Sequence, residues 1–525
     1  MAAPSIQFIE GTGGLGRALP NNDHISALLF YTSGTLPSGF ATTSVATRCK
    51  AIYSADDAVA AGILKDYSDA TSAVAIYTFT NAGATADIVE LKVADIATAT
   101  GASQSTSLGA YTRLSTDTTV TLLGASYAAF INAGTNTHGY SATAATGVLT
   151  ITAPKRLGAY LNALTSITAT ITGTIAGTIT QQFGTGSGGA TAGVASRFIQ
   201  YYYQISEFFR IQPKGKLWVG FFGVPGSYTF SEVQDMQLNS SGEIRQVGVL
   251  KDAVWASADL TSLNTICNTL KGLYQPLQAI YAGNLQATTD ITTIADVSTL
   301  TANNVMDLIS QDGGGFGNFL YKMNGTSGIK SITCLGATLG ITSLRKVSES
   351  IAWVGVSNMS NGVELEVPAF SNGQLYSALS NNAIEALLSK NHIFLKKFPT
   401  YTGTYFIDSR MCITISSDYA YMEDNRTICK AERNLYIGYM PMLSSPITFN
   451  SNGTLADSTI ALFESIGNTA LDQMIRDGEL SAKGVVINPS QNVVATSTLS
   501  VAITLVKNGV ARTISIPIQF KPSIA

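Results

Sequence analysis

Short apolar runs that alternate with helix-length segments constrain the fold of this chain more than any other feature of the sequence. Buried-strand candidates lie at residues 217–222, 244–250, 277–282, 305–310 and 353–357. Helical stretches lie between them at residues 230–238, 260–274 and 329–347, and another apolar run occupies residues 25–31. Strands separated by helices at this spacing are typical of a parallel sheet. The pattern predicts a central α/β domain built from residues 21–69 and 190–374.

The stretch between these two parts, residues 70–189, has a different composition. Thr, Ala, Ser and Gly dominate, and charged residues almost disappear after Asp117. Residues 147–153 alternate as a strand does, and residues 165–180 alternate Thr with Ile or Ala. The Gly/Ser-rich residues 185–189 are typical of a flexible linker. The segment therefore predicts a β-rich insertion domain.

The region from residue 375 to 495 mixes helices with short strands. Helices are expected at residues 383–388 and 426–437, and strands at residues 393–398 and 411–415. Asp457 is placed to cap a long helix that stops at Asp477-Gly478. The apolar stripe of that helix consists of Ile460, Phe463, Gly467, Ala470, Leu471 and Met474. We expect an α+β C-terminal domain here.

The last segment, residues 496–525, predicts an apolar hairpin that serves as a C-terminal arm. Two runs alternate apolar with polar residues, and Asn508-Gly509 between them is a strong hairpin signal because both residues tolerate a positive φ. Pro517 restricts the second run to an edge position. Two strands alone are marginal in water, so the hairpin needs cover, and cover from another subunit makes it an assembly device. The strand residues are Leu499, Val501, Ile503, Ile514, Ile516 and Ile518.

A second arm is expected at the N-terminus, over residues 1–20. Residues 5–10 form a short strand candidate with Ile6 and Phe8 on one face. The glycines of residues 11–16 match a dinucleotide-binding fingerprint by their letters. That fingerprint requires a following helix, and Pro20 with its neighbours predicts a loop instead. A flexible elbow is the favoured interpretation.

The composition narrows the functional classes. Charged residues make up 12% of the chain, and the usual share is about 25%. Such a surface fits either a β-rich domain with a Thr/Ser face or a subunit that is mostly covered in a polymer. A net charge of −3 gives no basic footprint for nucleic acid. No apolar run reaches membrane-spanning length, and no signal peptide is expected. The 5 cysteines are scattered, which predicts reduced, buried thiols.

Few residues point to chemistry, and no catalytic residue, metal ligand or cofactor is predicted. The 3 histidines, His24, His138 and His392, lack metal-ligand spacing, and residues 190–380 contain none. A charged cluster at residues 418–433 has two interpretations: a solvated start of a helix, or an ionic contact surface. It contains Asp418, Glu423, Asp424, Arg426, Lys430, Glu432 and Arg433.

A succession of motifs in the third region carries a resemblance to a known family. Asn425-Arg426-Thr427-Ile428 leads one helix, and Asn452-Gly453-Thr454-Leu455 precedes the long helix. Asp477-Gly478-Glu479-Leu480-Ser481, Val485-Val486-Ile487 and Thr496-Ser497-Thr498-Leu499 follow. This order resembles the C-terminal domain of contractile phage tail sheath proteins. Residues 126–153 resemble an insertion in some sheaths, and residues 217–357 occupy the place of a subtilisin-like domain without protease activity.

The resemblance implies a structural subunit of a helical sleeve around a rigid tube, rather than an enzyme. In that family, terminal arms exchange strands between subunits, and contraction drives the tube through the host envelope during delivery of a genome or an effector. The implied partners are neighbouring sheath subunits, the tail tube protein, and baseplate and tail terminator or neck proteins. The implied location is a virion tail, assembled in the host cytoplasm. The resemblance also predicts a tube-facing surface with Glu464, Asn468, Asp472 and Arg476.

Two other classes stay open. One is a hydrolase with a subtilisin-like α/β core, which requires a catalytic histidine beside an aspartate. His24 or His392 would have to supply it, because residues 190–380 contain no histidine. The other is a different tail or baseplate component.

Overall fold

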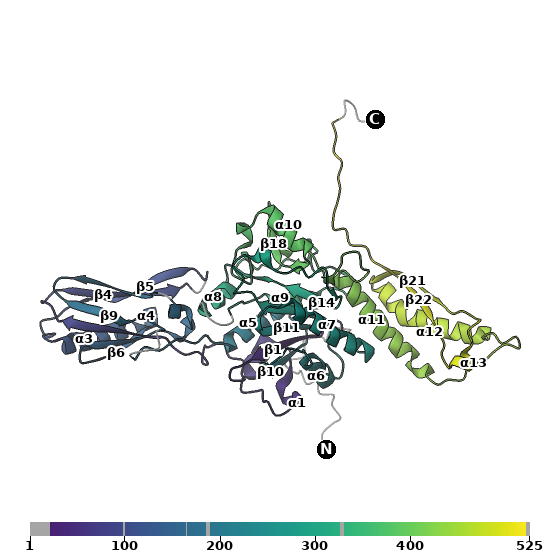
Figure 1. The fold of residues 1–525 in the computed structure, drawn as a ribbon, viewed down its shortest axis with the longest axis horizontal. Helices are drawn as coiled ribbons and strands as arrows, with labels where there is room; N and C mark the ends of the chain where they lie inside the picture. The colour runs from purple at the N-terminus through teal and green to yellow at the C-terminus, as the bar shows by residue number, and fades with distance from the viewer. Residues whose placement is uncertain (1–21, 98–99, 164, 185–188, 326–329, 521–525) are drawn as a thin grey trace, which may run out of the picture.

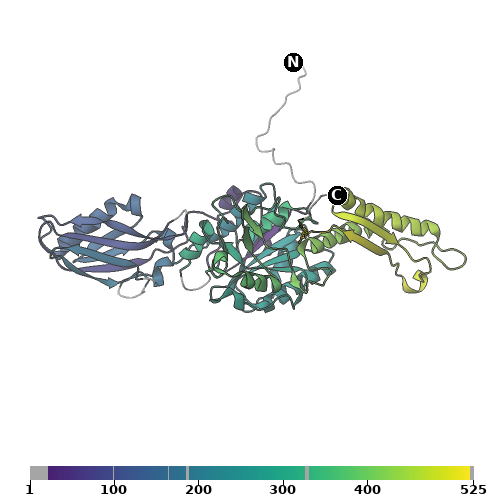
Figure 2. The same ribbon diagram turned by 90° about the horizontal axis from the view of Figure 1, so that it is seen from above.

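The computed structural model describes residues 22–97, 100–163, 165–184, 189–325 and 330–520. Three bodies lie in a row: a β-rich body at one end, a central α/β body, and a helical C-terminal body at the other end (Figures 1 and 2). The mixed α/β fold class predicted from the sequence is confirmed. The predicted N-terminal strand at residues 5–10 and the glycine elbow after it lie outside the described residues.

The central body is built on one 7-stranded sheet in the order β17-β14-β12-β11-β1-β10-β2. Each strand is parallel to its neighbour except β2, which is antiparallel on one edge. The apolar run at residues 25–31 becomes the buried strand β1, next to the middle of the sheet. The strands are β1 (Ser26–Thr32), β2 (Cys49–Ile52), β10 (Leu217–Gly223), β11 (Gln246–Val254), β12 (Gln278–Asn284), β14 (Val305–Leu308) and β17 (His392–Ile393).

Helices cover both faces of this sheet, which explains why its strands are apolar on both sides. Leu28 and Phe30 of β1 belong to a core formed with α5 (Phe198–Ile211) and α9 (Leu335–Leu344). Ala27 and Leu29 belong to the opposite core. That core is formed with α6 (Glu232–Asn239) and α7 (Ser257–Gly272). Successive side chains of a strand point to opposite faces, so the two cores follow directly from the sequence.

Smaller elements complete the central body. The strand predicted at residues 353–357 is absent: these residues form turns, and Trp353 is 51% exposed. The remaining strands here are β13 (Thr301–Ala302), β15 (Ser310–Asp312), β16 (Pro368–Phe370), β18 (Leu395–Phe398), β19 (Tyr401–Phe406) and β20 (Cys412–Ile413). The remaining helices are α1 (Val45–Arg48), α2 (Ala55–Ala60), α8 (Phe316–Met323) and α10 (Asn381–Ser389).

The β-rich body consists of two sheets around one core, in the orders β6-β7-β3-β9 and β5-β4-β8. Its strands are β3 (Val74–Asn81), β4 (Ile88–Ile96), β5 (Ser103–Thr112), β6 (Ser141–Ala145), β7 (Val148–Thr152), β8 (Ile167–Thr172) and β9 (Ala176–Gln181). The sequence reasoning missed its helix α3 (Val120–Ala133), which buries Leu123, Tyr127 and Ile131; α4 (Thr135–His138) follows.

The C-terminal body packs two long helices against a two-stranded ribbon. The helices are α11 (Met422–Tyr439) and α12 (Asp457–Arg476). The ribbon pairs β21 (Leu480–Val486) with β22 (Ala502–Lys507) in antiparallel register, and the short α13 (Val493–Thr496) lies between them in the chain. The N-cap of α12 is Ala456, without a side-chain cap, so the predicted capping role of Asp457 is wrong. The predicted stop at Asp477-Gly478 is confirmed, and Gly478 has a φ of +69°.

Candidate functional site

The predicted terminal hairpin does not form within the chain. β22 pairs instead with β21, so the strand at residues 480–486 covers it within the same chain. Asn508 is not a hairpin residue: its amide donates to the Gly478 carbonyl oxygen at 2.6 Å, and neither Asn508 nor Gly509 has a positive φ. Leu499, Val501 and Ile503 therefore belong to the core and groove of their own chain.

The second run of the predicted hairpin is instead an open segment. Residues 508–520 have no strand assignment, and after Arg512 they run away from the body (Figure 1). Ile514, Ile516 and Ile518 are 77%, 71% and 88% exposed, and Phe520 is fully exposed. Four large apolar side chains in water are unfavourable by about 1.5–3 kcal/mol each relative to burial. The segment is therefore an unpartnered apolar strand candidate.

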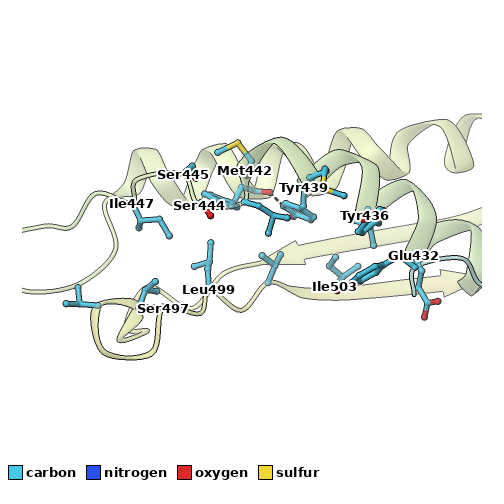
Figure 3. Close-up of a pocket in the computed structure, with 18 of the residues that line it drawn as sticks. Glu432, Tyr436, Tyr439, Met442, Ser444, Ser445, Ile447, Ser497, Leu499 and Ile503 are labelled. Carbon is cyan, nitrogen blue, oxygen red and sulfur yellow. Dashed lines mark hydrogen bonds between the residues drawn. The ribbon is translucent and has the colours of Figure 1, made fainter. Parts of the chain in front are cut away.

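An apolar groove lies along the inner side of β22. It has a volume of about 1170 Å³. Tyr436, Tyr439 and Met442 line it from the helical side, and Leu499 and Ile503 line it from the strand side (Figure 3). Several residues of its rim are open to solvent, including Tyr274, Leu443 and Val494 at 61%, 70% and 76% exposure.

The ribbon beside the groove is incomplete as a sheet. β22 pairs with β21 along one edge, and no strand of the described residues pairs with its other edge. A two-stranded ribbon is marginal by itself, and an unpaired edge presents free backbone donors and acceptors. Among the described residues, no further strand covers this edge or the groove.

Most of the charged cluster at residues 418–433 is buried, rather than forming a solvated helix start or an exposed contact surface. Glu423, Arg426 and Lys430 are 3%, 4% and 7% exposed. Lys430 binds Asp23 and Glu479, both at 2.7 Å, and Arg433 binds Asp23 at 3.1 Å. Glu423, Arg426 and Lys430 are therefore internal, whereas Asp418 is exposed and Glu432 is 38% exposed in its side chain. α11 fixes the chain at Asp23, just after the predicted N-terminal arm.

Electrostatics explain why Asp23 can be buried there. Burial opposes its ionisation, but Lys430 and Arg433 outweigh that effect and hold the pKa of this carboxyl below its ordinary value. Burial raises the pKa of Glu479, and Lys430 only partly offsets it. Sequence reasoning missed Asp23 and Glu479 as partners of α11, because no local pattern marks charges that lie so far apart in the chain.

The four predicted tube-facing residues do not form one free face. Glu464 accepts a hydrogen bond from the backbone N–H of Ile487 at 3.1 Å. Lys483 of β21 binds the Asp472 carboxylate at 2.5 Å and also reaches the Asn468 carbonyl oxygen. Glu464 and Asp472 thus use their side chains, and Asn468 its backbone carbonyl oxygen, to contact residues 483–487, although Asp472 is 48% exposed in its side chain. Arg476 lies on the solvent side and contacts Gln473.

A buried histidine–aspartate pair lies at the edge of the central sheet. His392 of β17 and Asp307 of β14 are register partners; Nδ1 of the ring lies 2.6 Å from Oδ2 of the carboxylate, and both residues are fully buried. Nε2 of His392 lies 2.9 Å from the carbonyl oxygen of Ala295. A carbonyl only accepts, so Nε2 carries the proton there, whereas a catalytic triad uses Nε2 as the base. The pair is a structural contact.

The carboxyl ends of the parallel strands, where an α/β sheet ordinarily binds a ligand, offer little space. The pocket there has a volume of about 20 Å³ and is lined by Tyr31, Arg197, Lys251, Asp252 and Asn284, among others. That is room for about one water molecule. Within the described ranges, no helix has the length and hydropathy of a membrane span, and no group of three or more His, Cys, Asp or Glu is arranged to hold a metal ion.

Comparisons with known proteins give one family and several structures. Residues 418–524 match the model of the C-terminal domain of DUF2586. A search of curated proteins finds no match. A structure of the anti-feeding prophage (AFP) baseplate, 6-fold symmetrised, is similar with a TM-score of 0.42 and 13% identity, over 61% of this chain and 81% of that chain.

Two further structures are similar to the same degree. A PVC sheath complex of an extracellular contractile injection system, in the contracted state, has a TM-score of 0.41 and 13% identity, over 62% of this chain and 81% of that chain. The AFP baseplate in the contracted state has a TM-score of 0.40 and 13% identity, over 61% of this chain and 84% of that chain.

Proposed function

We propose that this chain is a structural subunit of a contractile tail sheath. It polymerises helically around a tail tube and contracts to drive that tube through a host envelope, delivering a genome or an effector. Its partners are neighbouring copies of itself, the tail tube protein, and baseplate and tail terminator or neck proteins. Its place is the tail of a phage or of a phage-like injection particle. The family resemblance of the C-terminal motifs supports this role.

One observation carries the proposal: an open apolar segment and an unpaired strand edge occur in the same chain. Ile514, Ile516, Ile518 and Phe520 recur at every second residue, so they share one face of an extended strand. β22 alternates in the same way, with Ile503 and Leu505 packed toward the helices. A strand with one apolar face fits beside β22 and covers the groove.

Strand addition between subunits supplies both affinity and register. Backbone hydrogen bonds to the free edge of β22 give affinity, and the alternate side chains that enter the groove fix the register. Pro517 has no N–H, so the added strand pairs continuously on one side only, which suits an outermost position. The predicted N-terminal strand with Ile6 and Phe8 is expected to pair in the same mesh.

Strand exchange also suits contraction. The paired strands hold neighbouring subunits together while the bodies rotate and translate around the connecting segments, which is a hinge-type change. The tube-facing surface remains a proposal on α12, with Arg476 as the predicted residue on its solvent side. Reversal of charge at both Asp472 and Arg476 with unchanged tube binding would remove that assignment.

The test compares two substitutions on opposite faces of the same segment. Ile516→Asp places a charge on the apolar face, and we expect the purified chain to lose its ability to form tubes in electron microscopy. Ser515→Asp adds the same charge one residue away on the polar face, and we expect tubes of normal length. Both positions are exposed in the free chain, so neither change disturbs the fold.

The outcome also distinguishes a sheath subunit from the two other candidate functions, a different tail or baseplate component and a hydrolase. If both variants form tubes equally well, the segment is not an assembly strand. If the native chain forms no tubes but particles of another form, a different tail or baseplate component is the better description. Peptide hydrolysis that disappears in His392→Ala would support the hydrolase, against the hydrogen bond that occupies Nε2 of His392.

A further inference from the structure

The C-terminal segment makes one strong contact after it leaves the ribbon. Beyond β22, the chain returns to the junction of the central body and α11, and the side chain of Arg512 is bound there. Asp408, Ser409, Tyr421 and Glu423 form the binding site, which we call the Arg512 socket. Asp408 and Ser409 follow β19, whereas Tyr421 and Glu423 stand at the start of α11.

The geometry of the socket fits a guanidinium group. Nε of Arg512 lies 2.9 Å from a carboxylate oxygen of Asp408, and Nη2 lies 2.5 Å from a carboxylate oxygen of Glu423. Nη2 also lies 3.2 Å from the hydroxyl oxygen of Ser409. The guanidinium carbon lies 3.4 Å from the centre of the Tyr421 ring. A planar, forked donor over an aromatic ring matches this arrangement, and a lysine ammonium does not.

The acidic groups of the socket are buried and need a cation. Asp408 and Glu423 are 6% and 3% exposed. Arg410 binds the second oxygen of Asp408 at 3.0 Å. The second oxygen of Glu423 accepts from the Ser409 hydroxyl at 2.6 Å, and Arg512 is the cation paired with Glu423. Burial raises the pKa of Glu423, and Arg512 favours its ionised form. A buried carboxylate without a cation is costly, so the site is built for Arg512.

The contacts around Arg512 end abruptly in both directions. Residues 509–511 make no hydrogen bond or ion pair with any other described residue, and neither do residues 513–520. The side chain of Arg512 is 27% exposed, whereas Ile514 is 77% exposed. We propose that the Arg512 socket, and not the end of β22, fixes where the C-terminal segment leaves the body of the subunit.

This anchor sets the reach of the segment. Asn508 is bound to Gly478 and Ser481, so without the socket residues 509–512 would add roughly 14 Å of extended chain. With Arg512 bound, the apolar residues after it start from a fixed point on the central body. α11 then fixes both ends of the folded chain, because it binds Asp23 through Lys430 and Arg433 as well as Arg512 through Glu423. The proposal concerns a single chain and stands whether or not subunits exchange strands.

The experiment measures the position of the segment in the dilute, unassembled full-length chain. Spin labels are placed at Glu385→Cys, on the exposed side of α10, and at Thr513→Cys, directly after the anchored residue. The five native cysteines are buried, so the introduced thiols react selectively. Pulsed electron paramagnetic resonance should give one narrow distance distribution for the native socket. Arg512→Ala should broaden that distribution to at least twice its width, and Arg512→Lys should not restore it.

Lys507→Ala is the matched control. It also removes one positive charge near the base of the segment, but Lys507 binds Asp424 from a side chain that is 55% exposed and lies outside the socket. We expect its distance distribution to stay narrow. The double variant Arg512→Ala with Glu423→Gln removes the unpaired carboxylate, so it stays folded and should still be broad. An unchanged distribution in Arg512→Ala, or equal broadening in Lys507→Ala, would overturn the proposal.

Discussion

The half-buried Glu364 lies beside the buried carboxylates of Asp312 and Glu207 at the start of α8. Its Oε2 accepts from the backbone N–H of Phe316 at 3.0 Å, and Asp312 accepts from the N–H groups of Gly314 and Gly315. Glu207 is nearby but is paired with Arg210 at 2.7 Å. Burial, with the negative charges of Asp312 and Glu207, raises the pKa of Glu364 to about 7. The group is therefore more easily protonated in the folded chain than in the unfolded chain.

A pH dependence of stability follows from this shift. The ordinary pKa of a glutamate is about 4.3, so the stabilisation linked to protonated Glu364 is complete below that pH and is lost as pH rises through about 7. Glu364→Gln keeps a neutral side chain at all pH values. We expect the melting temperature of this variant, relative to the native chain, to rise by several degrees between pH 5 and pH 8. Thermal unfolding followed by circular dichroism measures it.

Glu385→Gln serves as the control for that measurement, because Glu385 is exposed on α10. Its difference from the native chain should be the same at both pH values. A pH-independent difference for Glu364→Gln as well would contradict the assignment of the proton to this carboxyl group.

The burial of charged residues on α11 could not be predicted from the sequence. The sequence of residues 418–433 suggested a solvated helix start or a contact surface, because charged side chains of both signs on one helix usually face water. Their burial depends on Asp23, Glu479 and Arg512, which lie far away in the chain. The local pattern carries no information on such partners, so the sequence did not predict the burial of Glu423, Arg426 and Lys430.

Helices α5 and α9 touch through their backbones. A Cβ at Gly336 would lie 1.8 Å from the carbonyl oxygen of Gln204, and one at Gly340 would lie 2.9 Å from the carbonyl oxygen of Phe208. The Gln204 side chain also accepts from the Gly336 N–H at 2.7 Å. Two small residues one turn apart thus allow a close approach of the helices on one face of the central sheet.

Gly336→Ala should separate these helices. We expect a loss of roughly 1–3 kcal/mol of unfolding free energy, the usual range for overpacking a core, measured by urea denaturation. Gly272→Ala at the end of α7 is the control, since no heavy atom lies within 4 Å of the added Cβ. It should leave stability unchanged or raise it slightly. Equal effects of the two substitutions would show that the helix contact is not tight.

Periodicity explains which elements the sequence predicted. The strands β10, β11 and β12 and the helices α6, α7 and α12 lie where alternation or helical spacing placed them, because each buries a regular apolar stripe. The prediction of a terminal hairpin was wrong for a related reason. Periodicity identifies a strand but not its partner, and β22 found β21 rather than residues 514–520. The turns at residues 353–357 show the same limit for a short apolar run.

The whole molecule is an extended row of bodies, and α8 joins the first two. Phe319, Leu320 and Met323 of α8 belong to the same core as the two sheets of the insertion. The change of composition predicted a β-rich insertion at residues 70–189, and the described strands β3 to β9 lie within it. Its attachment through α8 was not predictable, because α8 lies far beyond the insertion in the sequence.

All five cysteine thiols are buried, and burial makes them hard to ionise. Burial raises the pKa of Cys49 and Cys334 to about 12 and that of Cys429 to about 11, and Cys267 and Cys412 are shifted upward as well. We expect all five thiols to resist a disulfide reagent in the native chain at pH 8 and to react fully in urea, as measured by mass spectrometry. A thiol that reacts within seconds under native conditions would contradict the burial of its site.

The five cysteines are unevenly distributed over the three bodies, so their modification rates report on only part of the chain. Each sulfur reacts only when its surroundings open, so its modification rate counts openings of the central sheet, its helices or α11. Residues 70–189 contain no cysteine. An opening of the β-rich body would therefore change none of these rates. A thiol assay that finds the chain rigid describes only the central body and α11.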